Sequence, residues 1–349
     1  MAVMSVLARI GRLAWRFRSS RKGFAVLWLL IVVFLGRAAV RAYAEYGDVS
    51  PAFHGVPFVI AVAVLTVRSG ITPVKWYYLL RAHGSSLRFT TVSRAFYLSQ
   101  LSSYIPGGIW KHLDMGYRAA EEGEEIDAAM HSVVFVQGMT VAAALFYAAA
   151  VAALVLRPWS PLFVASAVAV LLVAVVSADL LERMKGGLET VFDVDVPSYT
   201  PSKKTLAGLF LLSLFIWVLN GIFFYFLTAA FADVGVSLFL PLSGIIAASW
   251  AAGFLVLILP GGLGVREGVM VYLLARLVAL PEALAVAAAA RVLFLAADVA
   301  MALLFSSTRL INGQMSRPVV SSVSRWWRMV SWKSVMCGSV SGNRAWLQE

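Results

Sequence analysis

Residues 259–268 read Leu-Pro-Gly-Gly-Leu-Gly-Val-Arg-Glu-Gly and end a long hydrophobic run with a proline, a glycine pair and two charged residues. Proline removes a backbone donor and clashes with the preceding turn, while glycines free the backbone, so a helix is expected to break here. The same Pro-Gly-Gly tripeptide stands 154 residues earlier, at positions 106–108, again after an apolar and aromatic run and before a charged patch. These two PGG copies predict an internal duplication with one broken helix in each half.

The composition around the PGG copies is that of an integral membrane protein. Of the 349 residues, 61% are hydrophobic and 13% are charged, and the mean hydropathy is +0.84. A soluble domain carries roughly 25% charged residues, so this chain cannot cover a water-facing surface. The single cysteine, Cys337, excludes an intrachain disulfide. We therefore predict an all-α, multi-pass protein of the cell membrane.

Hydropathy predicts eight transmembrane helices. A helix needs about 20 mostly apolar residues to cross the hydrocarbon core, and a shorter run can be tilted, extended or partly inserted. The second and seventh runs are short. The eight runs are Phe24 to Tyr43, Phe53 to Val67, Ala128 to Leu156, Ser160 to Leu180, Thr205 to Phe231, Val236 to Leu259, Val265 to Leu280 and Glu282 to Phe305.

Basic residues are concentrated in the two tails. Residues 1–23 hold six Lys or Arg and no acid, and residues 306–349 hold six against one acid, so the tails account for the net charge of +11. The positive-inside rule predicts both termini in the cytoplasm, next to anionic lipids of the inner leaflet. The loop after the second run, from Arg68 to Arg118, falls on the same side. Charges are balanced in the rest of the chain, which excludes nucleic-acid binding through overall basicity.

These patterns define the domain organisation. Residues 1–23 form a basic tail, residues 24–305 a transmembrane domain with repeats at about 24–180 and 205–305, and residues 306–349 a basic tail rich in tryptophan. The apolar run from Phe24 to Gly36 could pass for a signal peptide. Because Arg37 and Arg41 follow it in place of a small-residue cleavage site, we expect an uncleaved first helix.

The PGG copies also predict a site. Broken helices at membrane depth are tolerated only where protein or a water-filled cavity surrounds the freed backbone groups. Paired Gly/Pro interruptions in the two halves of a chain indicate a transporter's substrate site, and the helix resuming after each break has an N-terminus that could face an anion. The alternative is that each PGG copy is simply a loop between helices.

The sequence resembles a known family at three places: Ser99 to Trp110, the string at residues 259–268, and Ala290 to Leu293. It is similar there to the lysylphosphatidylglycerol synthase transmembrane-region family, whose members are also called flippase-like membrane proteins. The resemblance implies movement of lipids or lipid-linked sugars between leaflets. The sequence departs from that family at Gln137 and Gly138, because many relatives have a charged pair near these positions.

Charged residues near the second PGG copy are candidates for this site, because ionisable groups in the membrane are costly unless paired or hydrated. Arg266 and Arg291 are predicted to form a cationic wall that meets a lipid phosphate, with Glu267 holding one of them in place. Alternatively, Glu267 and Arg291 form a buried pair that only ties two helices together. Asp298 lies two turns after Arg291 on the same helical face. The candidate substrate-binding residues are Pro106, Gly107, Gly108, Lys111, Pro260, Gly261, Gly262, Arg266, Glu267 and Arg291.

The charged patch after the first PGG copy comprises Lys111, His112, Asp114 and Arg118. It is either the counterpart of the cationic wall or an ordinary set of cytoplasmic charges.

Two other function classes stay open. Asp193-Val194-Asp195 has the Asp-x-Asp form with which many glycosyltransferases hold a divalent ion, although its loop is too short for a nucleotide-binding domain. The second open class is a non-transporting scaffold in an envelope-glycan complex. Metalloprotease, serine-hydrolase and P-loop motifs are absent from the sequence, and we expect no cofactor and no bound metal. The sequence thus favours a transporter of a membrane lipid or polyprenyl-linked glycan with an anionic headgroup over a membrane-embedded glycosyltransferase or its accessory subunit.

Overall fold

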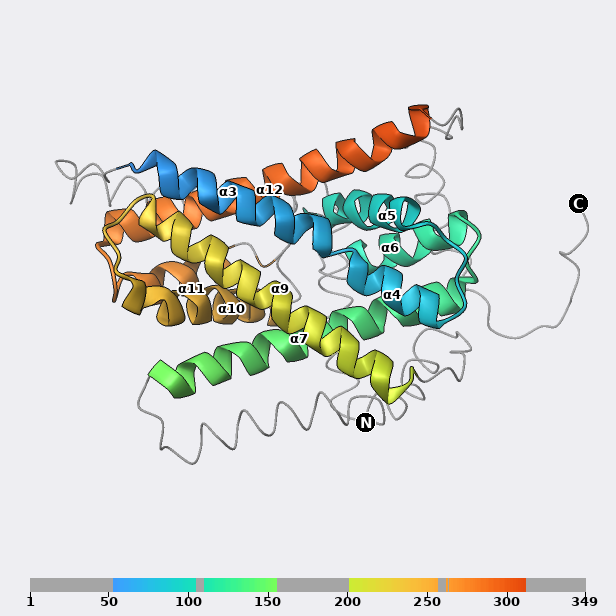
Figure 1. Cartoon of the computed structure of the whole chain (residues 1–349), viewed down its shortest axis with the longest axis horizontal. Helices are drawn as coiled ribbons and strands as arrows, with labels where there is room; N and C mark the ends of the chain where they lie inside the picture. Colours follow the sequence, from blue (N-terminus) through green and yellow to red (C-terminus); the bar gives the residue numbers. More distant parts are fainter. Residues whose placement is uncertain (1–52, 105–109, 156–200, 257–261, 263, 312–349) are drawn as a thin grey trace, which may run out of the picture. The chain divides into compact units, whose positions relative to one another are not determined.

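The computed structural model describes residues 53–104, 110–155, 201–256, 262 and 264–311, and all regular structure within these ranges is helical (Figure 1). The chain divides into two units, Met1–Phe305 and Ser306–Glu349, and the helices below belong essentially to the first. The predicted all-α class is confirmed for the described part, whereas the internal duplication and the domain boundaries stay predictions.

Five helical stretches are long and apolar enough to cross a membrane, which makes the chain a multi-pass membrane protein. They correspond to the second, third, fifth, sixth and eighth predicted runs. The first and fourth runs, Phe24 to Tyr43 and Ser160 to Leu180, lie outside the described residues. The five stretches are Gly55–Ala82, formed by α3 (Gly55–Ile71) and α4 (Val74–Ala82); Ala128–Val155, in α7 (Ile126–Val155); Lys203–Ala229, which is α9; Val236–Leu255, formed by the 3-10 turn η2 (Val236–Leu238) and α10 (Phe239–Leu255); and Leu280–Ser306, in α12 (Leu280–Ile311).

The second run extends well beyond its predicted end at Val67. Thr72 is the C-cap of α3 and donates from its backbone nitrogen and Oγ1 to the Arg68 carbonyl, at 3.0 and 2.8 Å, and Pro73 is the N-cap of α4. The prediction that Arg68 and Lys75 stand in a cytoplasmic loop is wrong, because the helical stretch continues through both. Their charges face an internal cavity, described below, and not the lipid, so they do not prevent this stretch from crossing the membrane.

The seventh run, Val265 to Leu280, does not form a span. Its helix α11 covers only Val265–Leu274, ten residues, or about 15 Å at 1.5 Å per residue. The hydrocarbon core is about twice as thick. The positive φ of Gly262 and Gly264 delays the start of α11, and a turn follows it directly, so the predicted count of eight spans is wrong at this run.

Each PGG copy connects two helices that pack against each other. Before the first copy comes α5 (Phe89–Leu101) with the turn η1 (Ser102–Tyr104), and after it α6 (Trp110–Glu121) packs on α5. Around the second copy, α10 packs on α11 in the same way.

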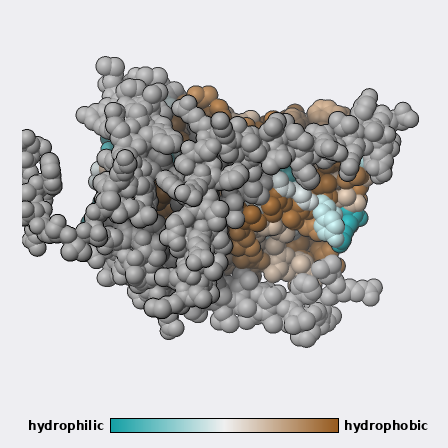
Figure 2. Space-filling model, turned by 180° about the vertical axis from the view of Figure 1, so that it is seen from behind, coloured by the Kyte–Doolittle hydropathy of each residue, from teal (hydrophilic) through white to brown (hydrophobic). Residues whose placement is uncertain are grey.

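Buried side chains hold these helices together in two main clusters. Trp76 and Tyr97 are central to the cluster between α4, α5, α6 and α7, where Trp76 Nε1 donates to Ser132 Oγ at 2.8 Å. Phe223 and Phe224 of α9 are central to the cluster with α3, α10, α11 and α12. The described outer surface visible in Figure 2 is mainly hydrophobic, as expected for side chains that face lipid acyl chains.

Candidate functional site

A cavity of about 210 Å³ lies among the helices, and each of the five candidate spans lines it with residues close to its middle. The short helices α5, α6 and α11 complete the lining. Membrane transporters bind substrates at this depth, between helices that are interrupted near the cavity. The mid-span lining residues include Arg68, Thr140, Asn220, Ile246 and Arg291.

The cavity is strongly cationic. Of the residues that the structure describes, one carboxylate, that of Asp298, lines it together with five basic side chains from α3, α4, α6, α11 and α12. Asp298 interacts electrostatically with the four that come from α3, α6, α11 and α12. Buried charges of one sign repel each other and lack hydration, so they favour a ligand of opposite charge. The five cations are Arg68, Lys75, Lys111, Arg266 and Arg291.

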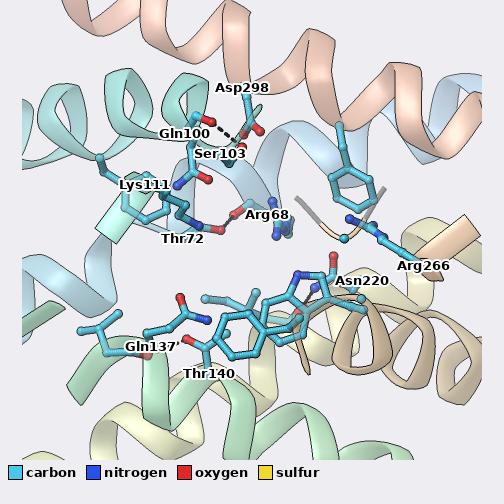
Figure 3. Close-up of a pocket in the computed structure, with 18 of the residues that line it drawn as sticks. Arg68, Thr72, Gln100, Ser103, Lys111, Gln137, Thr140, Asn220, Arg266 and Asp298 are labelled. Carbon is cyan, nitrogen blue, oxygen red and sulfur yellow. Dashed lines mark hydrogen bonds between the residues drawn. The ribbon is translucent and has the colours of Figure 1, made fainter. Parts of the chain in front are cut away.

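Two guanidinium groups share the ring of Phe294. The Cζ atoms of Arg68 and Arg266 lie 5.3 and 4.7 Å from the ring centroid, within the range of cation–π interactions. Figure 3 shows Arg68 between Lys111 and Arg266 in its view of the cavity. The buried Nε of Arg68 has no hydrogen-bond partner among the described residues. The ring therefore positions two planar donors that an oxyanion could bind.

Glu267 acts on the site from outside the cavity lining. Its Oε2 accepts a hydrogen bond from the backbone N–H of Gly264 at 2.8 Å and so caps α11. Its Oε1 lies 3.6 Å from Arg291 Nη1 on α12. At α11 the capping amide predicted to be available to an anion is thus bound by the chain's own carboxylate.

Gly262, the described residue of the second PGG copy, lines the cavity at a close backbone contact. Its φ is +69°, and a Cβ atom there would lie 2.7 to 2.8 Å from backbone atoms of Gly253 in α10. A Cβ on Gly253 would in turn lie 2.9 Å from Arg266 Cβ. Only glycine fits these two positions without displacement, and their contact brings Arg266 to the cavity wall.

The patch after the first PGG copy divides into two parts. Lys111 and His112 line the cavity, and Lys111 Nζ lies 5.8 Å from the centroid of the Phe96 ring. Asp114 does not line it: it pairs with Arg118 at 3.1 Å and accepts a hydrogen bond from Ser102 Oγ at 2.7 Å. Lys111 and His112 therefore line the same cavity as Arg266 and Arg291, whereas Asp114 links α6 to η1 through Arg118 and Ser102.

Neutral polar and aromatic side chains form another part of the wall. Lys75 Nζ donates to Thr140 Oγ1 at 2.7 Å, and Gln137 stands beside Thr140 on the same helix (Figure 3). Trp217 and Trp250 meet edge to face with centroids 5.3 Å apart, and Phe254 stacks on Trp250. Such a wall offers contacts to a neutral part of a headgroup.

The structure brings together part of the predicted set. Lys111, Arg266, Arg291 and Gly262 line one cavity, and Glu267 contacts it through Arg291. The remaining candidates, and the Asp193-Val194-Asp195 motif, lie outside the described residues. These candidates are Pro106, Gly107, Gly108, Pro260 and Gly261.

Sequence reasoning missed three charged residues of the cavity. Arg68 and Lys75 were assigned to a loop, and Asp298 was noted for its position without being assigned to the site. All three stand in helical stretches that are long and apolar enough to cross a membrane, and a charge inside such a stretch is itself the signal that identifies them.

Comparison with known families supports the resemblance noted from the PGG copies and their flanking residues. A comparison with curated proteins found no match. A family model described as "Lysylphosphatidylglycerol synthase TM region" matches residues 22–302, and the chain therefore belongs to this family of membrane proteins.

Proposed function

We propose that the chain is a flippase-like transporter that moves a lipid or a lipid-linked glycan with an anionic headgroup from one leaflet to the other. The observation that carries this proposal is the cationic cavity lined from the middle of five candidate spans. A headgroup crossing the membrane needs a polar environment at the point where the bilayer is most apolar. The apolar outer surface leaves the acyl chains in lipid.

In this proposal, the two PGG segments, one between α5 and α6 and one between α10 and α11, are broken or re-entrant elements related by an internal duplication. The short helix that follows each PGG copy contributes a cation to the cavity: Lys111 from α6 and Arg266 from α11. The cations receive the phosphate, and the tryptophans of α9 and α10 contact the rest of the headgroup. Both termini lie in the cytoplasm, where the basic tails bind anionic lipids of the inner leaflet.

The proposal is tested by reconstitution of the purified chain into vesicles containing acyl-labelled nitrobenzoxadiazole lipids. Dithionite bleaches only the label in the outer leaflet, so a transporter increases the fraction bleached beyond that in protein-free vesicles. Mass spectrometry of the recovered lipids separates the alternatives: a glycosyltransferase yields a new covalent product, whereas a transporter changes only leaflet occupancy. Unchanged bleaching with labelled phosphatidic acid, phosphatidylglycerol and polyprenyl phosphate would contradict the proposal.

A further inference from the structure

The charge balance of the cavity constrains which headgroup it takes. Among the described lining residues, five basic side chains accompany one carboxylate, that of Asp298, so basic groups outnumber carboxylates by four. With Glu267, which pairs with Arg291 from outside the lining, the described basic groups still outnumber the described carboxylates by three. A phosphodiester such as phosphatidylglycerol carries one negative charge and would leave most of this excess uncompensated. An aminoacylated headgroup adds an ammonium group and would increase it.

The cations also lie at different parts of the cavity wall. Arg68 and Arg266 lie at Phe294, Arg291 is held by Glu267, and Lys111 lies at Phe96 on another helix. In the view of Figure 3, Arg68 lies between Lys111 and Arg266, in agreement with the Phe294 ring shared by the two arginines and the separate Phe96 ring at Lys111. A single phosphate group has three or fewer free oxygens to share among these donors. Two linked phosphates present oxygens to donors on both sides of Arg68.

From these two observations we infer that the cavity selects a lipid whose headgroup carries a diphosphate, and that it rejects aminoacylated phosphatidylglycerol. The inference rests on the proposed function for the identity of the cavity as the substrate site. Arg68 binds the bridge region between the phosphates, Lys111 one phosphate and Arg266 the other. Guanidinium groups suit this role because they donate two parallel hydrogen bonds to a phosphate and stay charged.

A substitution of Asp298 is expected to strengthen diphosphate binding, whereas substitutions of the cations are expected to weaken it. The Asp298 carboxylate interacts with four of the cations and competes with an incoming anion for them. Asp298→Asn removes one negative charge while keeping the shape of the side chain, so the variant is expected to bind diphosphate more tightly. Loss of a cation, as in Arg68→Gln, has the opposite effect.

The first test measures binding without transport. The purified chain in detergent micelles is heated with sodium diphosphate, phosphate or sulfate at matched ionic strength, since a ligand that binds the folded state raises the unfolding temperature. We expect diphosphate to act at about tenfold lower concentration than phosphate, the effect of one further charge-assisted hydrogen bond. Arg68→Gln and Lys111→Gln should each weaken the diphosphate response, and Asp298→Asn should strengthen it.

Arg276→Gln is the matched control, because Arg276 is an exposed arginine that stacks on Tyr272 outside the cavity lining. Its diphosphate response should equal that of the unmodified chain. Arg68→Lys, which keeps the charge, covers the case in which Arg68→Gln does not fold, and it should bind diphosphate more weakly than the unmodified chain. An equal response to all three anions, or a response unaffected by every cavity variant, would overturn the inference.

The second test separates the inference from the proposed function. Vesicles carry acyl-labelled lipid diphosphate, phosphatidylglycerol or lysyl-phosphatidylglycerol, and dithionite reports the initial rate for each. We expect the diphosphate lipid to cross fastest and lysyl-phosphatidylglycerol not to cross. Transport of lysyl-phosphatidylglycerol at the same rate would contradict the inference and leave the proposed function intact. Diphosphate binding in the first test without transport of any lipid would contradict the proposed function and leave the anion selectivity intact.

Discussion

Glu267 Oε1 lies 3.6 Å from Arg291 Nη1, and the same carboxylate caps α11 through the Gly264 amide. Arg291 also lines the cavity. Arg291 can therefore contact a substrate in the cavity and, at the same time, tie α12 to α11 through Glu267. A residue at the start of α11 holds the α12 arginine at the cavity wall.

A double-mutant cycle measures this tie. The side chains of Glu267 and Arg291 are 14 and 21% exposed, so Glu267→Gln removes a partly buried carboxylate 3.6 Å from Arg291 and weakens the α11 cap. We expect each single change to Gln to lower the thermal stability in detergent, and the double variant to regain part of it, with a coupling free energy of about 1 kcal/mol. Strictly additive losses would contradict a direct interaction.

Substitutions of Arg291 separate charge from geometry. Arg291→Lys keeps the charge and loses the bidentate donors, so partial transport is expected, whereas Arg291→Ala should nearly eliminate it. The measurement is the initial dithionite rate, with folded protein verified by its unfolding temperature. Equal rates for both variants and the unmodified chain would show that Arg291 does not contact the headgroup.

The close contact between Gly262 and Gly253 predicts that a methyl group added at Gly262 lowers the stability of the protein. Gly262→Ala places a Cβ within 2.8 Å of the Gly253 backbone at a φ of +69°, which should cost about 1–3 kcal/mol of stability. Gly268→Ala is the matched control, because a Cβ there meets nothing within 4 Å inside α11 and alanine favours a helix. Thermal unfolding of both variants checks this, and an equal response would mean that the contact does not constrain the fold.

Thr140 is expected to position Lys75. Thr140→Val removes the hydroxyl that accepts from Lys75 Nζ, while Thr140→Ser retains it. Because a buried ammonium without an acceptor is costly, Val should lower stability by about 1–3 kcal/mol and Ser by much less. Unfolding temperatures of the two variants provide the measurement. A smaller loss with Val than with Ser would show that packing of the methyl group matters more than the hydrogen bond.

The topology is tested by cysteine labelling. With Cys337 replaced, a membrane-impermeant maleimide added from outside should modify a cysteine at Ser50 and leave cysteines at Ser20 and Ser341 unmodified. This follows from the positive-inside rule applied to the basic tails. External labelling of either tail would contradict a cytoplasmic location of both termini.

Hydropathy predicted four of the five described spans to within a few residues, because a lipid-facing helix must be apolar along its length. It failed where a span carries charges: Arg68 ended the second run, although its helix continues. At Val265 to Leu280 it predicted a span where the structure has a ten-residue helix, because apolar composition does not show the positive φ of Gly262 and Gly264 before α11 or the turn that follows Leu274.

The candidate site was predicted in part for a related reason. Lys111, Arg266 and Arg291 stood near the PGG copies or inside a clear span, and all three line the cavity. Arg68 lies far from both copies in the sequence, and the packing of α3 against α9 and the contact of Arg68 with Phe294 of α12 bring it to the cavity. Which face of a helix meets a cavity depends on such packing, which the sequence alone does not show.

The most direct test of the central claim compares lipid movement by the unmodified chain, Arg68→Gln and Arg276→Gln in the same vesicles. The probe is a diacylglycerol diphosphate labelled on an acyl chain or a polyprenyl diphosphate labelled on its isoprenoid chain, and the quantity measured is the initial rate of dithionite bleaching per folded protein. We expect Arg68→Gln to lose most of the rate and Arg276→Gln to match the unmodified chain, because only the first removes a cation from the cavity. Equal rates for all three proteins, or no movement above protein-free vesicles, would contradict the assignment of this cavity as the path of an anionic headgroup.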